Sequence, residues 1–145
     1  MNDTVERRVP AWFWIVAGLA LLWELSGVIA YMMQVTMTAD QLAALPEGQR
    51  HLQSITPGWI TALFAVAVWS GLTAAIGLLM RRRWAQPLFI ASLVAAIIQF
   101  GWIFAIGRAH HVIGPSAIPL PVTIIVIGIM LVIVANRAAK RGWLR

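Results

Sequence analysis

The chain has 145 residues, of which 61% are hydrophobic and 11% charged, and its mean hydropathy of +0.83 excludes an ordinary soluble domain. It has no cysteine, which excludes disulfides, thiolate metal sites and cysteine nucleophiles. The net charge of +6 does not indicate a nucleic-acid partner, because the basic residues gather at the ends of apolar segments. This composition predicts an all-α integral membrane protein whose main partner is the lipid bilayer.

Four apolar segments are long enough to cross a hydrocarbon core, which takes about 20 helical residues. They cover approximately residues 11–33, 58–80, 84–106, and 121–135 with its flanks. The sequence therefore predicts a single domain, residues 1–145, built as a four-transmembrane-helix bundle. The first segment could be mistaken for a signal peptide, but it is longer than a secretory apolar region of about 7 to 15 residues, and we expect it to be retained.

The basic residues predict the topology of the four spans. Arg50 and Arg108 fall on one side of the membrane, and the other nine of the 11 Lys and Arg residues fall on the opposite side. Those nine are Arg7, Arg8, Arg81, Arg82, Arg83, Arg137, Lys140, Arg141 and Arg145. The positive-inside rule then places both termini and the loop of residues 81–83 in the cytoplasm. A run such as residues 81–83 is usually an orientation signal, and its contact with anionic lipid is an additional hypothesis.

Glu24 is the most unusual residue, because it lies near the middle of the first apolar segment. An ionised acid at a helix centre costs roughly 2.5 to 3.5 kcal/mol, so such residues usually face other helices. Gln99 lies at nearly the same depth in the third segment, and its amide can pair with a carboxyl group if the two helices touch. The pair is either a protonatable site in a translocation pathway or a structural hydrogen bond. Both interpretations remain open.

Small residues at spacings of three and four mark the faces that we expect to pack inside the bundle. In the first three spans these faces contain Ala17, Ala20, Gly27, Gly71, Ala75, Gly77, Ser92 and Ala95. Ser70 lies on the inward stripe of the second span and joins the hypothetical solute and proton pathway. The fourth span has no polar stripe, so we expect it to have the greatest lipid exposure.

The loop of residues 34–57 is the longest polar segment and is predicted to lie outside. Thr38 and Gln41 have the spacing of a capping box, which predicts a short interfacial helix before Pro46. A second helical turn is expected over residues 47–54. The loop is either a lid over a central site or an amphipathic connector lying on the membrane, and the second interpretation is favoured.

Aromatic and histidine residues offer weaker candidates. Trp23, Trp69 and Trp102 can stack on an apolar sugar face, although interior packing or lipid contact is the simpler interpretation. His110 and His111 lack the carboxylates that would complete a metal site, so we predict no metal and no cofactor. The chain has no phosphate-binding loop, nucleophile and base pair, or dinucleotide fingerprint, so we do not expect an enzyme.

Three stretches carry a family resemblance: residues 22–28 (LWELSGV), the region from Gly71 through residues 81–89 (RRRWAQPLF), and residues 142–144 (GWL). With them, the chain resembles small four-span bacterial membrane proteins that are often labelled sugar transporters. The resemblance covers nearly the full length. It implies the four-span fold, a transport role and a location in the bacterial inner membrane, and its motifs are features of packing and topology.

Two functions are therefore expected from the sequence. The first is a small-solute carrier, with sugars as the candidate solutes, in which Glu24, Gln99, Ser70, Trp23 and Trp102 line the pathway. Because four helices enclose little space and the two helical pairs show no obvious repeat, such a carrier would act as a homo-oligomer. The second is a non-catalytic accessory or assembly subunit of a larger membrane complex, docked through the apolar fourth span.

Overall fold

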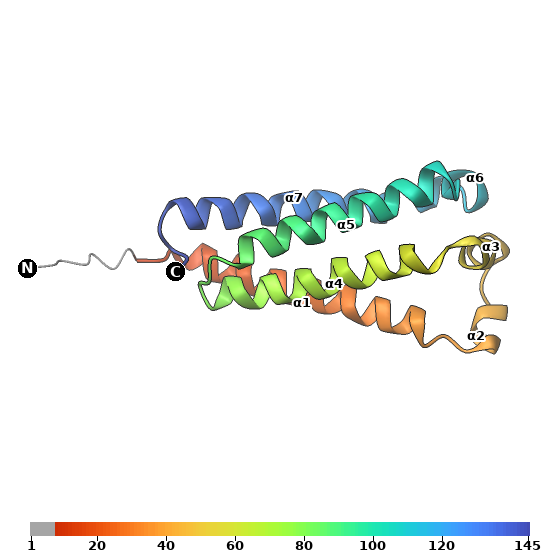
Figure 1. Cartoon of the computed structure of the whole chain (residues 1–145), viewed down its shortest axis with the longest axis horizontal. Helices are drawn as coiled ribbons and strands as arrows, with labels where there is room; N and C mark the ends of the chain where they lie inside the picture. Colours follow the sequence, from red (N-terminus) through yellow and green to blue (C-terminus); the bar gives the residue numbers. More distant parts are fainter. Residues whose placement is uncertain (1–7) are drawn as a thin grey trace, which may run out of the picture.

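The computed structural model describes residues 8–145, and within this part of the chain every regular element is helical. Residues 1–7, including the predicted topology residue Arg7, lie outside the described residues. Four long helices, α1 (Ala11–Val35), α4 (Gly58–Leu79), α5 (Ala85–Ala105) and α7 (Pro119–Lys140), run lengthwise in an elongated bundle (Figure 1). All four are long and apolar enough to cross a membrane, which confirms the predicted all-helical chain with four membrane-length helices.

Short elements gather at one end of the bundle, which we call the loop end (Figure 1). They are α2 (Ala39–Ala43), α3 (Glu47–Ile55), α6 (Ala109–Val112) and the 3₁₀ turn η1 (Pro115–Ala117). The predicted capping box is confirmed: Gln41 N donates to Thr38 Oγ1 at 3.2 Å, and Thr38 N donates to Gln41 Oε1 at 2.9 Å. The C-terminus lies at the opposite end, which we call the terminal end.

The long helices pack in chain order, α1 against α4, α4 against α5, and α5 against α7. Between the antiparallel helices α1 and α4, the rings of Tyr31 and Phe64 meet edge to face with centroids 5.4 Å apart. One turn further along, a Cβ added at Gly27 would lie 3.4 Å from Val68 Cγ1. Matched steps of four residues on both helices therefore keep these two contacts in register.

Polar side chains fix the other two helix pairs. Ser92 Oγ of α5 donates a 2.6 Å hydrogen bond to the Ala67 carbonyl of α4. Between α5 and α7, Gln86 Nε2 donates to Asn136 Oδ1, and Leu93 packs on Gly128. An interhelical hydrogen bond of this kind contributes on average about 0.6 kcal/mol in a membrane protein, so these bonds set register more than they supply stability.

The largest cluster of buried side chains lies toward the terminal end and draws on all four long helices. Its members are Phe13, Ala17, Ala20, Ala74, Ala75, Leu78, Ala85, Phe89, Leu131, Ala135, Ala138, Trp143 and Leu144. Alanine predominates, which lets the helix backbones approach closely. The bundle is therefore tightly closed at this end.

Residues 142–145 complete the closure by lying along the α4–α5 loop, residues 81–83, and we call this pairing the clasp. The backbone N–H of Arg83 donates to the Arg145 carbonyl at 2.9 Å, and the N–H of Arg145 donates to the Arg81 carbonyl. Arg81 Nε also donates to the Trp143 carbonyl at 2.7 Å. A tryptophan near the end of a membrane span usually lies at the lipid interface. Trp143 is instead 6% exposed and packs against Phe13 with ring centroids 5.8 Å apart.

Arg81 occupies a backbone conformation that normally favours glycine. Its φ is 58°, and it follows the last residues of α4 in a Schellman turn, with Arg81 N donating to the Leu78 carbonyl and Arg82 N to the Gly77 carbonyl. The matching turn after α7 uses Gly142, with φ 72°. Residue 81 is an arginine and not a glycine because its side chain donates the hydrogen bond to the Trp143 carbonyl.

We expect Arg81→Ala to be less stable than Arg81→Gly by about 1 kcal/mol, because both lose the bond to Trp143 but only alanine keeps the strained left-handed backbone. Unfolding by denaturant in detergent micelles measures the difference. The same pair of substitutions at exposed Arg82, whose φ is not positive, is the control, and glycine should give no advantage there. Equal stability of the two variants at residue 81 would contradict the role of the turn.

Candidate functional site

Glu24 lies in the seam between α1 and α4, with its carboxyl group directly over Gly71. A Cβ at residue 71 would be 2.7 Å from Glu24 Cδ, closer than side-chain atoms approach one another. The contact continues the register of Gly27 on Val68, with matched steps of three residues on both helices. The side chain is half-buried, and within residues 8–145 it forms no hydrogen bond. The carboxyl group therefore occupies its place because residue 71 has no side chain.

Gln99 of α5 is 8% exposed and is the one buried polar or charged side chain among the described residues. Its amide has no hydrogen-bond partner within residues 8–145. Every fully buried side-chain nitrogen or oxygen within residues 8–145 has a hydrogen-bond partner. Since the amide of Gln99 has none among these residues, the amide is not sealed from solvent. The amide opens onto a pocket at the loop end, and an amide left permanently unpaired would cost about 1 to 3 kcal/mol.

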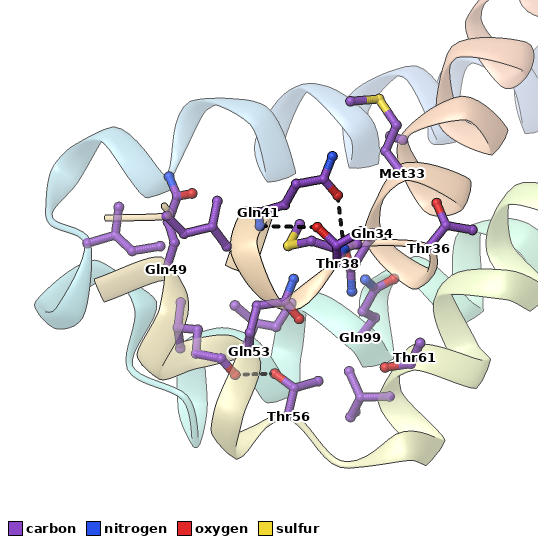
Figure 2. Close-up of a pocket in the computed structure, with 17 residues that line it drawn as sticks. Met33, Gln34, Thr36, Thr38, Gln41, Gln49, Gln53, Thr56, Thr61 and Gln99 are labelled. Atoms are coloured by element: carbon purple, nitrogen blue, oxygen red, sulfur yellow. Dashed lines mark hydrogen bonds between the residues drawn. The ribbon is translucent and has the colours of Figure 1, made fainter. Parts of the chain in front are cut away.

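The pocket has a volume of about 790 Å³ and is formed by the C-terminal end of α1, α2, α3, the start of α4 and the last turns of α5. This volume is within the usual range of roughly 300 to 1,000 Å³ for small-molecule sites. Figure 2 shows Gln53 of α3 and Gln99 of α5 among the side chains that reach the pocket from different elements. Gln99 forms the floor of the pocket, and the loop helices form its roof.

The roof is held against the rest of the loop end by close contacts at two glycines. A Cβ at Gly48 of α3 would lie 3.1 Å from the carbonyl carbon of Val112, and a Cβ at Gly107 would lie 3.2 Å from Leu52 Cδ2. Arg50 braces α3 against α2 by donating from Nη1 to the Ala43 carbonyl at 3.0 Å. The loop thus takes part in a cavity, and its opening as a lid stays a prediction.

The structure places Glu24 and Gln99 in two different surroundings. Helix α1 packs against α4 and not chiefly against α5, Glu24 is not among the residues that line the pocket, and within residues 8–145 no hydrogen bond joins the two side chains. Equal depth alone does not bring the two side chains together, because the expected contact also required α1 and α5 to be neighbours. The carboxyl group and the pocket amide are therefore separate features.

The other residues of the predicted pathway also lie outside the pocket lining. Ser70 is half-buried and donates to the Val66 carbonyl of its own helix. Trp23 and Trp102 are half-buried, and Trp69 is 47% exposed. Among residues 8–145 no aromatic side chain lines the pocket, so none of these tryptophans is placed to stack on a molecule bound there.

The residues predicted to pack between helices occupy buried or half-buried positions. Ala17, Ala20, Gly71, Ala75, Gly77 and Ala95 are buried, whereas Gly27 and Ser92 are half-buried. Gly77 is covered by the Trp84 ring, since an added Cβ would lie 2.6 Å from Trp84 Cζ3. At the loop end, His110 stacks on Phe104 with centroids 6.1 Å apart, and no group of three metal-ligating side chains occurs within residues 8–145.

Sequence reasoning missed the polar residues that make the pocket, chiefly Gln34, Gln49, Gln53 and Thr61. A signal for them was present. Four of the six glutamines in the chain fall between residues 34 and 53, in the loop for which the residue pattern favours an amphipathic connector over a lid. A concentration of amides in a loop that folds back over helix ends would have pointed to a polar pocket.

We expect Gly71→Ala to destabilise the bundle by about 1 to 3 kcal/mol, because the new methyl group would overlap the carboxyl group of Glu24. Unfolding in detergent micelles measures the loss. Gly18→Ala in α1 is the matched control, since nothing lies within 4 Å of an added Cβ there. The double variant Gly71→Ala with Glu24→Ala should recover most of the loss, and a double variant no more stable than Gly71→Ala alone would contradict the contact.

Comparison of the chain with protein-family models, with curated proteins and with solved structures finds no match in any of the three. The resemblance to small four-span bacterial proteins labelled sugar transporters therefore stays a prediction. The function has to be argued from the geometry of the pocket and of the α1–α4 seam.

Proposed function

We propose that the protein is a small-solute carrier of the bacterial inner membrane, with sugars as the candidate solutes, and that the pocket at the loop end is its solute-binding site. The buried amide of Gln99 is the observation that carries this proposal. A polar side chain so deeply buried is normally hydrogen-bonded, and this one faces a cavity large enough for a small molecule. A bound solute would provide the missing partner.

The orientation of the pocket follows from the charge distribution. We place the terminal end, which has the clasp and most of the arginines, in the cytoplasm, because positively charged loops remain inside. The pocket then faces the outside, and α2 and α3 lie at the outer interface. In this arrangement the structure corresponds to an outward-facing state, open at the pocket and closed at the clasp.

Glu24 supplies the proposed link to protons. It lies between the pocket and the closed cluster, in the α1–α4 seam, where a carboxyl group without a hydrogen-bond partner among the described residues can gain or lose a proton without breaking a hydrogen bond. An asparagine or glutamine would serve a purely structural role without risking a charge. We infer that the protonation state of Glu24 biases the packing of α1 on α4.

A second copy of the chain completes the proposed carrier. Alternating access commonly uses two repeats moving against each other, and one bundle of four helices contains no obvious repeat. The alternative function is an accessory subunit of a larger membrane complex. This alternative is favoured by the span that contains α7. Only 6% of the most apolar 18-residue stretch of this span is buried, which is the smallest share among the four candidate spans.

We expect purified protein in liposomes to take up radiolabelled glucose faster than protein-free liposomes, with faster uptake when the outside is acidic. Glu24→Gln should abolish this dependence on the pH gradient, because an amide cannot carry the proton, while uptake without a gradient is retained. Thr73→Val is the control, because the Thr73 hydroxyl bonds only the Trp69 carbonyl of its own helix on an exposed face. Uptake equal to that of protein-free liposomes, for glucose and for sorbitol, would contradict the carrier.

The two functions also differ in what accompanies the protein on gentle extraction. Native mass spectrometry of the carrier should show a homo-oligomer without other chains. Stoichiometric copies of an unrelated membrane protein would favour the accessory subunit instead, and α7 would then be the helix to test for contact.

A further inference from the structure

The polar residues that line the pocket are all uncharged. They are five glutamines and four threonines: Gln34, Thr36, Thr38, Gln41, Gln49, Gln53, Thr56, Thr61 and Gln99. A charged solute would enter without a counter-ion, and burying an unpaired charge is costly. The lining therefore offers no counter-charge to an ion of either sign.

Several of these polar groups are already used within the protein. The hydroxyls of Thr36 and Thr56 each donate at 2.6 Å to a carbonyl of the preceding helical turn, and Thr38 and Gln41 are paired in the capping box. The remaining groups are the amides of Gln34, Gln49, Gln53 and Gln99 and the hydroxyl of Thr61, none of which has a hydrogen-bond partner within residues 8–145. Figure 2 shows these side chains arranged around the pocket from α1, α3, α4 and α5.

The chemistry of these free groups selects the kind of solute. Each glutamine amide offers two N–H donors and one carbonyl acceptor, and a solute hydroxyl both donates and accepts, so the two groups pair in either direction. The apolar part of the lining is aliphatic, including Met33, Leu52, Ile60 and Ile103, and it offers C–H surface without an aromatic face. A compact solute with several hydroxyl groups and an aliphatic carbon skeleton satisfies both parts of the wall.

We propose that the loop-end pocket binds a small uncharged polyhydroxylated solute through the free amides of Gln34, Gln53 and Gln99, and that it rejects charged analogues of the same size. This deepens the proposed carrier function and rests on the same pocket. Gln99 is the most discriminating contact, because it is the most deeply buried of the free amides. Gln53 contacts the solute from α3, in the roof of the pocket.

The test uses the full chain in detergent micelles and measures the thermal shift with glucose, sorbitol, glycerol, gluconate and glucosamine. At neutral pH the first three are uncharged, gluconate is an anion and glucosamine is a cation. At least one neutral compound should stabilise the protein, and gluconate and glucosamine should bind at least about tenfold more weakly than the neutral compound that stabilises it most. Stabilisation by a charged analogue as large as that by the most stabilising neutral compound would overturn the proposal, as would the absence of any shift with all three neutral compounds.

Variants locate the site. Gln99→Leu should weaken binding of the neutral compound by about tenfold or more while the variant remains folded, because leucine suits a buried position. Gln53→Leu, at a half-buried roof position, gives an independent reading if Gln99→Leu fails to fold. Thr73→Val should bind as the parent does. Unchanged binding in both glutamine variants would overturn the assignment of the pocket.

Binding and transport fail separately in these experiments. Neutral solutes that stabilise the protein but are not taken up by liposomes leave the pocket assignment intact and overturn the carrier. Uptake that does not distinguish glucose from gluconate and is unaffected by Gln99→Leu supports a carrier and overturns the pocket chemistry.

Discussion

The close approach of α1 to α4 is the constraint on which the arrangement of polar groups depends. Gly71 leaves room for the carboxyl group of Glu24, and Gly27 and Tyr31 continue the same register toward the loop end. A larger side chain at residue 71 would force either the helices apart or the carboxyl group out of the seam. Because the two helices meet so closely, the backbone of α4 at Gly71 partly shields the carboxyl group of Glu24 from lipid. No side chain of α4 pairs with the carboxyl group. The acid is accommodated by shape and not by a counter-charge.

The same pairing separates the acid from the amide. With α1 committed to α4, α5 contacts α4 and α7, and Gln99 faces the space left at the loop end. The pocket exists because the loop helices α2 and α3 fold back over that space and are held there by contacts at Gly48 and Gly107. A bundle equally tight along its whole length would have buried Gln99 against a partner. The solute site therefore depends on the asymmetry between a closed terminal end and an open loop end.

Residue patterns in the sequence predicted the helices and the capping box, because apolar length and the Thr38–Gln41 spacing are local properties. The neighbours of each helix were not predictable in the same way. All four spans are apolar on nearly every face, so periodicity does not tell which stripe meets which helix, and equal depth of Glu24 and Gln99 does not make them contact. The clasp was missed for a related reason: a tryptophan near a membrane-span end usually faces the interface, whereas Trp143 is held inside by Phe13 and by hydrogen bonds to residues 81–83. The pocket depends on how a long loop folds back, which no local pattern specifies.

The clasp sets an energetic requirement for the proposed carrier. Opening the terminal end would break the hydrogen bonds of the clasp, each with a net contribution of about 0.5 to 1.5 kcal/mol. It would also expose Trp143 and Leu144, and the burial of a leucine side chain alone contributes about 1.5 to 3 kcal/mol. A solute bound with millimolar affinity has a binding free energy of only about 4 kcal/mol, and only the part that differs between two states can shift their populations. Solute binding is thus too weak to open the clasp by itself. A second source of free energy has to act on α1 or α4, and the protonation of Glu24, in the seam that leads from the pocket toward the closed cluster, is in the position to provide it.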